Sequence, residues 1–223
     1  MTQDATRIIA IRHGETDWNL ATRIQGQLDV GLNRNGRWQA ERVAEALADE
    51  HFDAVYSSDL ARAHDTALGL ARNAGLEVRS DRGLRERGFG AFEGLTYAEI
   101  EQRFPDAARC WRQREADFGP AGGETLRAFC DRAVGSVAAL AARHRGQHIA
   151  VVAHGGVLDA LYRAATRLPL EAPRTWDIAN ASINRLLASD DGLVVVGWDD
   201  TCHLDGPAPH ESGGAGPAAR GND

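Results

Sequence analysis

The chain has 223 residues, of which 43% are hydrophobic and 26% are charged. This composition is that of an ordinary globular protein, and the length suits one α/β domain with a substantial core. The formal net charge of −7 argues against binding to nucleic acid or to an anionic membrane surface, because both attract basic proteins. We therefore expect no nucleic-acid partner and no membrane partner.

The basic and sulfur-containing residues narrow the class of protein further. All 25 basic residues are arginine, so every permanent cation is a planar guanidinium suited to phosphate or carboxylate, although codon bias is the simpler explanation. The cysteines are odd in number and fit no metal-binding spacing: Cys110, Cys130 and Cys202. Reduced thiols, the lack of a signal-peptide pattern and the lack of a long apolar run together predict a cytoplasmic protein.

Strands and helices alternate through the first part of the chain. Short apolar runs predict strands at residues 7–11, 52–58 and 76–80. Helical spacing begins at about Gly36, where the apolar side holds Ala40, Val43, Ala44 and Leu47. A second helix is predicted over residues 59–75, with Asp59 as its N-cap and Gly75 as its stop.

The same alternation continues after a segment rich in glycine, arginine and aromatic residues. Within this segment, residues 82–124, short helices are predicted around 96–105 and 106–115. A long amphipathic helix, a buried strand and another helix are then predicted at residues 124–146, 148–154 and 157–168. Residues 182–198 read as two strands joined by an Asp-Asp-Gly turn.

This order of elements predicts an α/β fold, a three-layer α/β/α sandwich with a mostly parallel central sheet. We expect one domain over residues 1–204, with a cap-like segment around 86–122. Residues 205–223 are rich in glycine, proline and alanine, which predicts a flexible C-terminal tail.

Two of the predicted strands end in the same way, with an apolar run followed by histidine and glycine. If these strands are neighbours, their ends meet at the carboxyl edge of the sheet, beside the first turn of the helix that carries Arg62. The charged groups Arg12 and Arg62 would repel one another there unless an anion such as phosphate lay between them and the two histidines, His13 and His154. Glycines would let the backbone approach the anion: Gly14, Gly155 and Gly156.

Taken alone, each of these residues has a simpler interpretation. A single histidine at a strand end usually finds a local hydrogen-bond partner, and a single arginine on a helix usually faces solvent. The repeated pattern shifts the balance toward a site.

Five motifs in this order resemble the histidine phosphatase superfamily, which includes the cofactor-dependent phosphoglycerate mutases and many small phosphatases. The motifs are RHGETDWN from Arg12, SSDLARAHDTA from Ser57, LRERGFGAFEGLT from Leu84, GGET from Gly122 and VVAHGGVLDAL from Val151. The resemblance runs from residue 8 to about 187 and implies a phosphoglycerate mutase-like fold.

The resemblance assigns roles to matching residues. It implies that His13 is the nucleophile and forms a phosphohistidine, while Glu86 protonates the leaving group. Arg12, Arg62 and His154 would hold the phosphoryl oxygens, and no metal or cofactor would be needed. The substrate-binding residues expected around this centre are Asn19, Gln25, Gly26, Arg87 and Gly155.

Two assignments stay open at this point. Glu15 and Glu93 compete with Glu86 for the role of acid, and spacing alone does not choose between them. An arginine-rich stretch either grips an acidic substrate or is simply solvated: Arg85, Arg87, Arg112 and Arg114.

The departures from the mutase pattern favour hydrolysis. The segment between Glu93 and Gly122 is short and contains no lysine, and the arginine pair of the mutases is split here as RQR. Phe89 replaces a tyrosine of the mutase motif. The sequence therefore predicts a phosphatase acting on a small phosphate monoester. The alternatives are a mutase dependent on 2,3-bisphosphoglycerate and, more remotely, a silent phosphate-binding module. The resemblance also allows a homodimer through an edge strand.

Overall fold

A computed structural model describes residues 4–206, and its centre is a six-stranded sheet. The strand order is β3 (Val78–Ser80), β2 (Ala54–Ser57), β4 (His148–Ala153), β1 (Thr6–Arg12), β5 (Ile183–Ser189) and β6 (Gly192–Asp200). The first four of these strands run parallel, while β5 and β6 are antiparallel to their neighbours. Because β1 lies directly beside β4, the two strands that end in His-Gly are neighbours, which is the condition under which their histidines meet.

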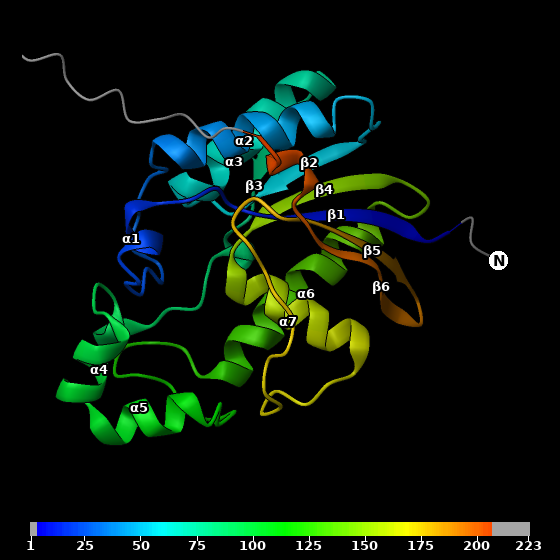
Figure 1. Cartoon of the computed structure of the whole chain (residues 1–223). Helices are drawn as coiled ribbons and strands as arrows, with labels where there is room; N and C mark the ends of the chain where they lie inside the picture. The colour runs from blue at the N-terminus through cyan, green and yellow to red at the C-terminus, as the bar shows by residue number, and fades with distance from the viewer. Residues whose placement is uncertain (1–3, 207–223) are drawn as a thin grey trace, which may run out of the picture.

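Two pairs of helices cover the two faces of the sheet (Figure 1). One face carries α2 (Arg34–Ala46) and α3 (Ala61–Ala74), and the other carries α6 (Leu126–Arg143) and α7 (Gly155–Thr166). Alternate side chains of β1 pack against the two helical layers. Ile8 lies in the hydrophobic cluster with α6 and α7, while Ile9 lies in the cluster with α2 and α3. The three-layer α/β/α sandwich is therefore confirmed.

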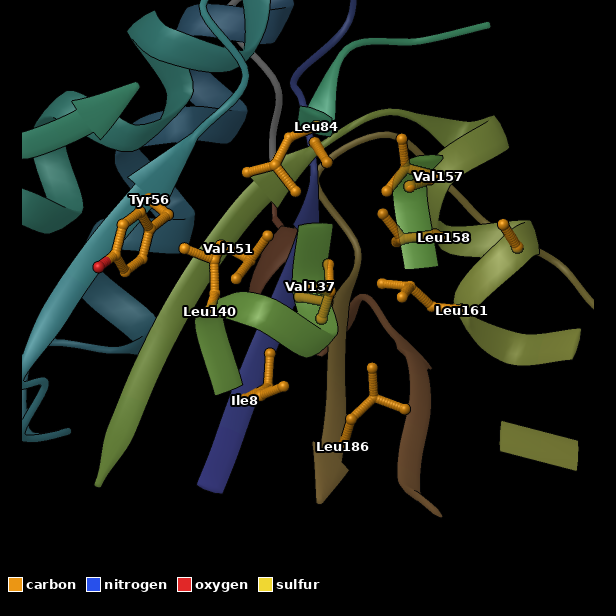
Figure 2. Packing of buried hydrophobic residues seen from close by; sticks show 14 of the residues in the cluster. Ile8, Tyr56, Leu84, Val137, Leu140, Val151, Val157, Leu158, Leu161 and Leu186 are labelled. Carbon is orange, nitrogen blue, oxygen red and sulfur yellow. The ribbon is translucent and has the colours of Figure 1, made fainter. Parts of the chain in front are cut away.

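The larger core lies between the sheet and the α6–α7 layer. Figure 2 shows Val137 and Leu140 of α6 packed over Ile8 and Val151 of the sheet, with Leu161 of α7 beside them. All of these side chains are nearly or wholly buried. Burial of each large aliphatic side chain contributes about 1.5–3 kcal/mol to the free energy of folding. This packing fixes the α6–α7 layer against the sheet and so holds the carboxyl ends of β1 and β4 in place.

A smaller cap stands beyond the carboxyl edge of the sheet (Figure 1). It contains the short helices α4 (Tyr97–Arg103) and α5 (Pro105–Arg112), and α1 (Asp17–Leu20) follows the first strand nearby. Its own core is Ile24, Phe92, Ile100 and Ala108, so the cap packs as a separate cluster. Single 3-10 turns occur at Arg82–Leu84, Gly90–Phe92 and Cys202–Leu204.

Local capping is partly as the sequence predicts. Gly75 ends α3 in the left-handed conformation, with φ of 66°, and the turn at Asp190 and Asp191 joins β5 to β6. The expectation that Asp59 caps α3 is wrong. The N-cap is Leu60, without a side-chain bond, and the Asp59 carboxylate accepts two hydrogen bonds from Arg85 at 2.6 and 2.7 Å. A bidentate guanidinium competes better for this carboxylate than one amide of the helix.

The remaining architectural expectations stay predictions. Most of the predicted tail, residues 207–223, lies outside the described residues. Within 4–206 no helix is long and apolar enough to cross a membrane. The outer strand β6 exposes Val194 and Val196, and the homodimer stays a prediction.

Candidate active site

The site lies where β1 and β4 end side by side. Arg12 and Ala153 are paired in register, so the next residues, His13 and His154, leave the sheet together. The His13 amide donates to the Ala153 carbonyl at 3.0 Å, and the centroids of the two imidazole rings are 5.1 Å apart. The register of one pair of parallel strands thus places both histidines at one point.

The backbone fixes which nitrogen of His13 faces the cavity. Nδ1 lies 2.7 Å from the carbonyl oxygen of Gly14, which can only accept, so Nδ1 carries the proton. The lone pair is consequently on Nε2, the nitrogen available to attack an electrophile. The Gly14 loop is itself held by a hydrogen bond from its amide to Thr66 Oγ1 at 3.0 Å.

His154 is fully buried, and both ring nitrogens lack a hydrogen-bond partner within the described chain. Buried polar groups normally have partners, so this ring is incomplete without a ligand. It forms the N-cap of α7 without a side-chain cap bond, and the positive end of that helix attracts anions.

Two guanidiniums complete the pocket, that of the buried Arg62 and that of the half-buried Arg12. Arg62 donates to the carbonyls of Gly26 and Leu28 at 2.8 and 2.9 Å, while Arg12 donates to the Ile178 carbonyl at 2.6 Å. In both residues Nε is buried and has no partner among residues 4–206. Burial lowers the pKa of Arg62 to about 10, which leaves the guanidinium charged at neutral pH. Two positive charges with unused donors, beside two histidines, form a site for a dianion such as phosphate.

Burial and the two arginines also decide the charge of the histidines. The pKa of His13 lies well below its usual 6.5 because the ring is buried and because Arg62 and Arg12 repel a further positive charge. The pKa of His154 is lowered well below 6.5 by burial, Arg62, His13 and Arg12. Both rings are therefore neutral at pH 7, which keeps Nε2 of His13 nucleophilic.

We expect this arrangement to weaken the fold in mild acid. Folded-state pKa values below the unfolded value mean that unfolding takes up protons, so stability is full above pH 6.5 and falls as the pH drops. The free energy of unfolding should fall as the pH is lowered from 8 to 5, because the unfolded chain takes up protons at both histidines that the folded chain does not bind. Urea titrations of the wild type and His13→Ala should show a smaller acid-dependent loss in the variant. Equal losses would contradict the assignment.

Glu86 is the candidate acid at this pocket. It lines the same cavity, its Oε1 accepts from the Arg87 amide at 2.7 Å, and its Oε2 accepts from the Gly156 amide at 2.9 Å. A Cβ atom at Gly156 would lie 2.2 Å from Glu86 Oε1, so the glycine is needed for this contact. Gly155 is different, since its added Cβ would meet only Arg12 Nε at 3.5 Å, an ordinary contact.

The two competing acids are engaged elsewhere. Glu15 accepts hydrogen bonds from Asn33 and Asn35 beside α2, and Glu93 accepts from the amides of Gln27 and Phe89. Neither lines the cavity. Of the three acids that spacing left open, the structure places only Glu86 at the phosphate pocket.

Comparison with known proteins agrees with this geometry. The family model described as "Histidine phosphatase superfamily (branch 1)" matches residues 8–201 of this chain. This chain belongs to the histidine phosphatase superfamily. It is 41% identical to phosphoglycerate mutase-like protein 4 of Arabidopsis thaliana, over 98% of this chain and 95% of that protein. It is 39% identical to the metal-independent phosphoserine phosphatase of the same plant, over 90% of this chain and 84% of that protein.

A solved structure gives the same result for the fold. The mycobacterial glucosyl-3-phosphoglycerate phosphatase in complex with VO3 superposes with a TM-score of 0.78 at 36% identity, covering 87% of this chain and 99% of that one. The resemblance stated from the motifs is thereby confirmed, and so is the phosphoglycerate mutase-like fold. The relatives' names include phosphatases, in agreement with the expected reaction class.

The cavity that His13 lines has a volume of about 350 Å³, and all five predicted substrate-binding residues line it, Arg87 and Gly155 among them. Asn19, Gln25 and Gly26 all line it. Gln25 Oε1 is buried without a partner within the described residues, while Asn19 Oδ1 accepts from the Thr16 amide at 3.0 Å. Gly26 has φ of 54° and would bring a Cβ within 2.1 Å of Glu93, so it must be glycine to present its carbonyl to Arg62.

The structure separates the four arginines of the Arg-rich stretch. Arg85 is bound to Asp59 and Arg112 pairs with Glu101, and neither lines the cavity. Arg87 and Arg114 do line it.

Those two arginines are already partly engaged. Arg87 is buried and donates hydrogen bonds to the carbonyls of Glu124 and Phe118, so most of its guanidinium donors are already used within the cap segment. Arg114 donates through Nη2 to Asp159 at 2.8 Å.

Other lining residues escaped the sequence analysis. Arg174, on the loop after α7, is exposed at the cavity, and Asp159 lies on α7 itself. No motif marks Arg174. A signal for Asp159 was present, since a carboxylate interrupts the apolar face of a buried helix. Within residues 4–206, no group of three or more His, Cys, Asp or Glu side chains is arranged to hold a metal ion.

Proposed function

We propose that this chain hydrolyses small-molecule phosphate monoesters through a phosphohistidine intermediate on His13. One observation carries the proposal: Nδ1 of His13 is bonded to the Gly14 carbonyl, so Nε2 presents its lone pair in a cavity lined by the guanidiniums of Arg12 and Arg62. A nucleophile and a phosphate-binding pocket coincide there, which is what phosphoryl transfer requires.

The phosphate group binds first. Arg12 and Arg62 supply the positive charge and the unused Nε–H donors, and His154 supplies a neutral ring. The first residues of α7, Gly155 and Gly156, line the same cavity, so the positive end of the helix dipole adds to the attraction. Because these groups are fixed by backbone carbonyls, little reorganisation is needed as charge shifts during the reaction.

Phosphoryl transfer to the enzyme follows. Nε2 of His13 attacks phosphorus, the bond between phosphorus and the ester oxygen breaks, and its electron pair leaves with the alcohol oxygen. Glu86, in its acid form, gives that oxygen a proton. Its carboxyl group is oriented by the amides of Arg87 and Gly156 and keeps a second lone pair on each oxygen for this exchange.

Water completes the cycle. The Glu86 carboxylate removes a proton from water, the water oxygen attacks phosphorus, and the bond between phosphorus and Nε2 breaks. Inorganic phosphate leaves, and both His13 and Glu86 return to their starting states. The same carboxyl group thus serves as acid in one half of the cycle and as base in the other.

Hydrolysis is favoured over mutase chemistry by the state of the outer arginines. A mutase must hold a substrate that carries two phosphate groups, which requires a second anion site. Arg85 and Arg112 are neutralised by Asp59 and Glu101 outside the cavity, and Arg114 is paired with Asp159. Arg174 and part of Arg114 remain for the leaving alcohol, which fits one carboxylate better than a second dianion.

The compartment and assembly belong to this proposal too. Cys110, Cys130 and Cys202 are all free thiols in the structure, which supports a reducing, cytoplasmic location. Within residues 4–206, β6 forms one edge of the sheet, which supports a homodimer through that strand.

The test is phosphate release from several monoesters without added metal. We expect the purified protein to release phosphate from p-nitrophenyl phosphate, 3-phosphoglycerate and O-phosphoserine in the presence of EDTA. A parallel assay should follow conversion of 3- to 2-phosphoglycerate with 2,3-bisphosphoglycerate as primer, and we expect none above background. Conversion without phosphate release would make the chain a mutase, and neither reaction would make it a silent binding module.

A further inference from the structure

Glu86 stands on a stretch of chain without regular secondary structure. The 3-10 turn Arg82–Leu84 ends just before it, and residues 86–89 belong to no helix or strand. An acid transfers its proton from within hydrogen-bond distance, about 2.6–3.2 Å, of the oxygen that receives it. The backbone that carries Glu86 must therefore be fixed by contacts from elsewhere in the fold.

Arg132, on α6, supplies these contacts. Its Nη1 donates hydrogen bonds to the carbonyls of Gly83 and Arg85 at 2.8 and 3.0 Å, and its Nη2 donates to the carbonyl of Glu86 at 3.2 Å. Because a guanidinium is planar and rigid, these donors keep a fixed geometry relative to one another. One side chain thereby holds the backbone both before Glu86 and at Glu86 itself.

Glu124 fixes Arg132 in turn. Its carboxylate accepts hydrogen bonds from Arg132 Nε at 2.8 Å and from Nη2 at 2.7 Å. The same carboxylate accepts from the Gly88 amide at 2.7 Å, and the Glu124 amide donates to the Gly88 carbonyl at 2.8 Å. Burial would raise the pKa of Glu124, but the hydrogen bonds from Arg132 and the Gly88 amide lower it below its usual value, so the carboxylate is charged at neutral pH. Residues 83–88 are thus held on both sides of Glu86.

These contacts occupy all the donors of Arg132. A guanidinium has five N–H groups. Three of the hydrogen bonds of Arg132 go to backbone carbonyls and two go to Glu124. The side chain does not line the active-site cavity. Arg132 therefore has no donor left for a substrate, and its contacts reach the reaction through Glu86.

We propose that Arg132 is a positioning residue for proton transfer, which places the carboxyl group of Glu86 at the oxygen of the leaving alcohol. The proposal rests on the proposed phosphatase function and deepens it. The side chains of His13, Arg12 and Arg62 are held by other backbone carbonyls. Loss of the Arg132 guanidinium should therefore displace Glu86 and leave the nucleophile and the phosphate-binding groups in place.

The first test compares two esters in Arg132→Ala. In single-turnover formation of the phosphoenzyme, the rate with 3-phosphoglycerate should fall by about 10- to 100-fold, the cost of a misplacement of roughly 1 Å. The rate with p-nitrophenyl phosphate should fall by no more than about threefold, because p-nitrophenolate leaves without a proton. A residue that only stabilises the fold would not separate the two esters, so equal losses on both would overturn the proposal.

A double variant tests whether Arg132 acts through Glu86. In the Glu86→Gln background, replacing Arg132 by alanine should lower the rate with 3-phosphoglycerate by no more than about threefold further, because the acid that it positions is already lost. A further loss as large as that in the single variant would show that Arg132 acts independently of Glu86, and would overturn the proposal.

Arg127→Ala is the matched control. Arg127 also lies on α6 and donates to a carboxylate, that of Asp117, at 2.8 and 3.3 Å. It makes no hydrogen bond to residues 83–88 in the described part of the chain and does not line the cavity. Its loss should change the rates with both esters by less than about twofold, as at an ordinary surface position. A selective loss with 3-phosphoglycerate in this variant as well would refute the assignment to Arg132.

Arg132→Lys separates geometry from charge, and it carries the test if the alanine variant does not fold. The charge of Arg132 also acts at His154, whose pKa is lowered by burial and by the positive groups around it. Lysine keeps that charge but lacks the rigid fork, so the selective loss with 3-phosphoglycerate should persist. Wild-type rates in the lysine variant would overturn the proposal.

Failure of the phosphatase function itself would be recognised separately. Wild-type turnover of p-nitrophenyl phosphate tests that function, and a selective loss with 3-phosphoglycerate in Glu86→Gln tests the acid. If both hold and the Arg132 variants do not separate the two esters, only the role of Arg132 is refuted.

Discussion

Replacing His13 by alanine should lower kcat on p-nitrophenyl phosphate by about 10⁴-fold or more, because the nucleophile is removed and no other group can take its place. His154 is the other ring at the site, but both of its ring nitrogens are buried and it is not among the residues that line the cavity. Steady-state turnover and labelling with a ³²P ester, quenched in alkaline detergent because phosphohistidine is acid-labile, both measure this. The variant should form no acid-labile phosphoprotein.

The control for this variant is His64→Ala. His64 lies on α3, two residues from Arg62, but its side chain is partly exposed and does not line the cavity. Its removal should change turnover by less than about threefold, as expected for a surface position. Far-UV circular dichroism should show that both variants keep the fold. A folded His13→Ala protein with near-full activity would refute the proposed mechanism.

Replacing Glu86 by glutamine should affect substrates according to their leaving groups. An alkyl alkoxide needs a proton to depart, so kcat/KM for 3-phosphoglycerate should fall by about 10²- to 10⁴-fold. A p-nitrophenolate leaves without a proton, so the loss in formation of the phosphoenzyme should be no more than about tenfold for that ester. Single-turnover kinetics with both esters measure the difference directly.

Two further variants make this result specific. The glutamine side chain cannot accept both amide bonds that Glu86 accepts from Arg87 and Gly156, so Glu86→Ala should be measured as well and should show the same dependence on leaving group. Glu15→Gln is the control, because Glu15 follows the His13 loop but is bonded to Asn33 and Asn35. Equal losses on both esters in the Glu86 variants would mean that another acid supplies the proton.

Most of the fold could be predicted from the sequence, because the hydrophobic patterns that define its strands and helices are local. The apolar runs of β1 and β4 are long enough to form buried strands, and α2, α3, α6 and α7 each have one apolar side. Alternation of such elements permits few arrangements other than a parallel sheet between two helical layers. Asp59 was predicted wrongly because its partner, Arg85, is distant in the chain. A guanidinium brought near by folding displaced the local cap.

The inner site was also largely determined by the sequence. His13 and His154 follow directly after neighbouring parallel strands, and such strand ends must share one edge of the sheet. The motif match placed Arg12, Arg62 and Glu86 with them, and all three line the same cavity. The order along β1 and β4 therefore fixes Arg12, His13 and His154, while Arg62 and Glu86 were found through the motif match.

Only the tertiary structure decided the choices between chemically equal residues. Glu15, Glu86 and Glu93 are alike in the sequence, but two of them are bound to distant backbone or amide groups and only Glu86 reaches the cavity. In the same way Arg114 lines the cavity while Arg85 and Arg112 are neutralised outside it. The physical reason is that a side chain's role depends on which partners compete for it. Those partners come from segments that only the folded chain brings together.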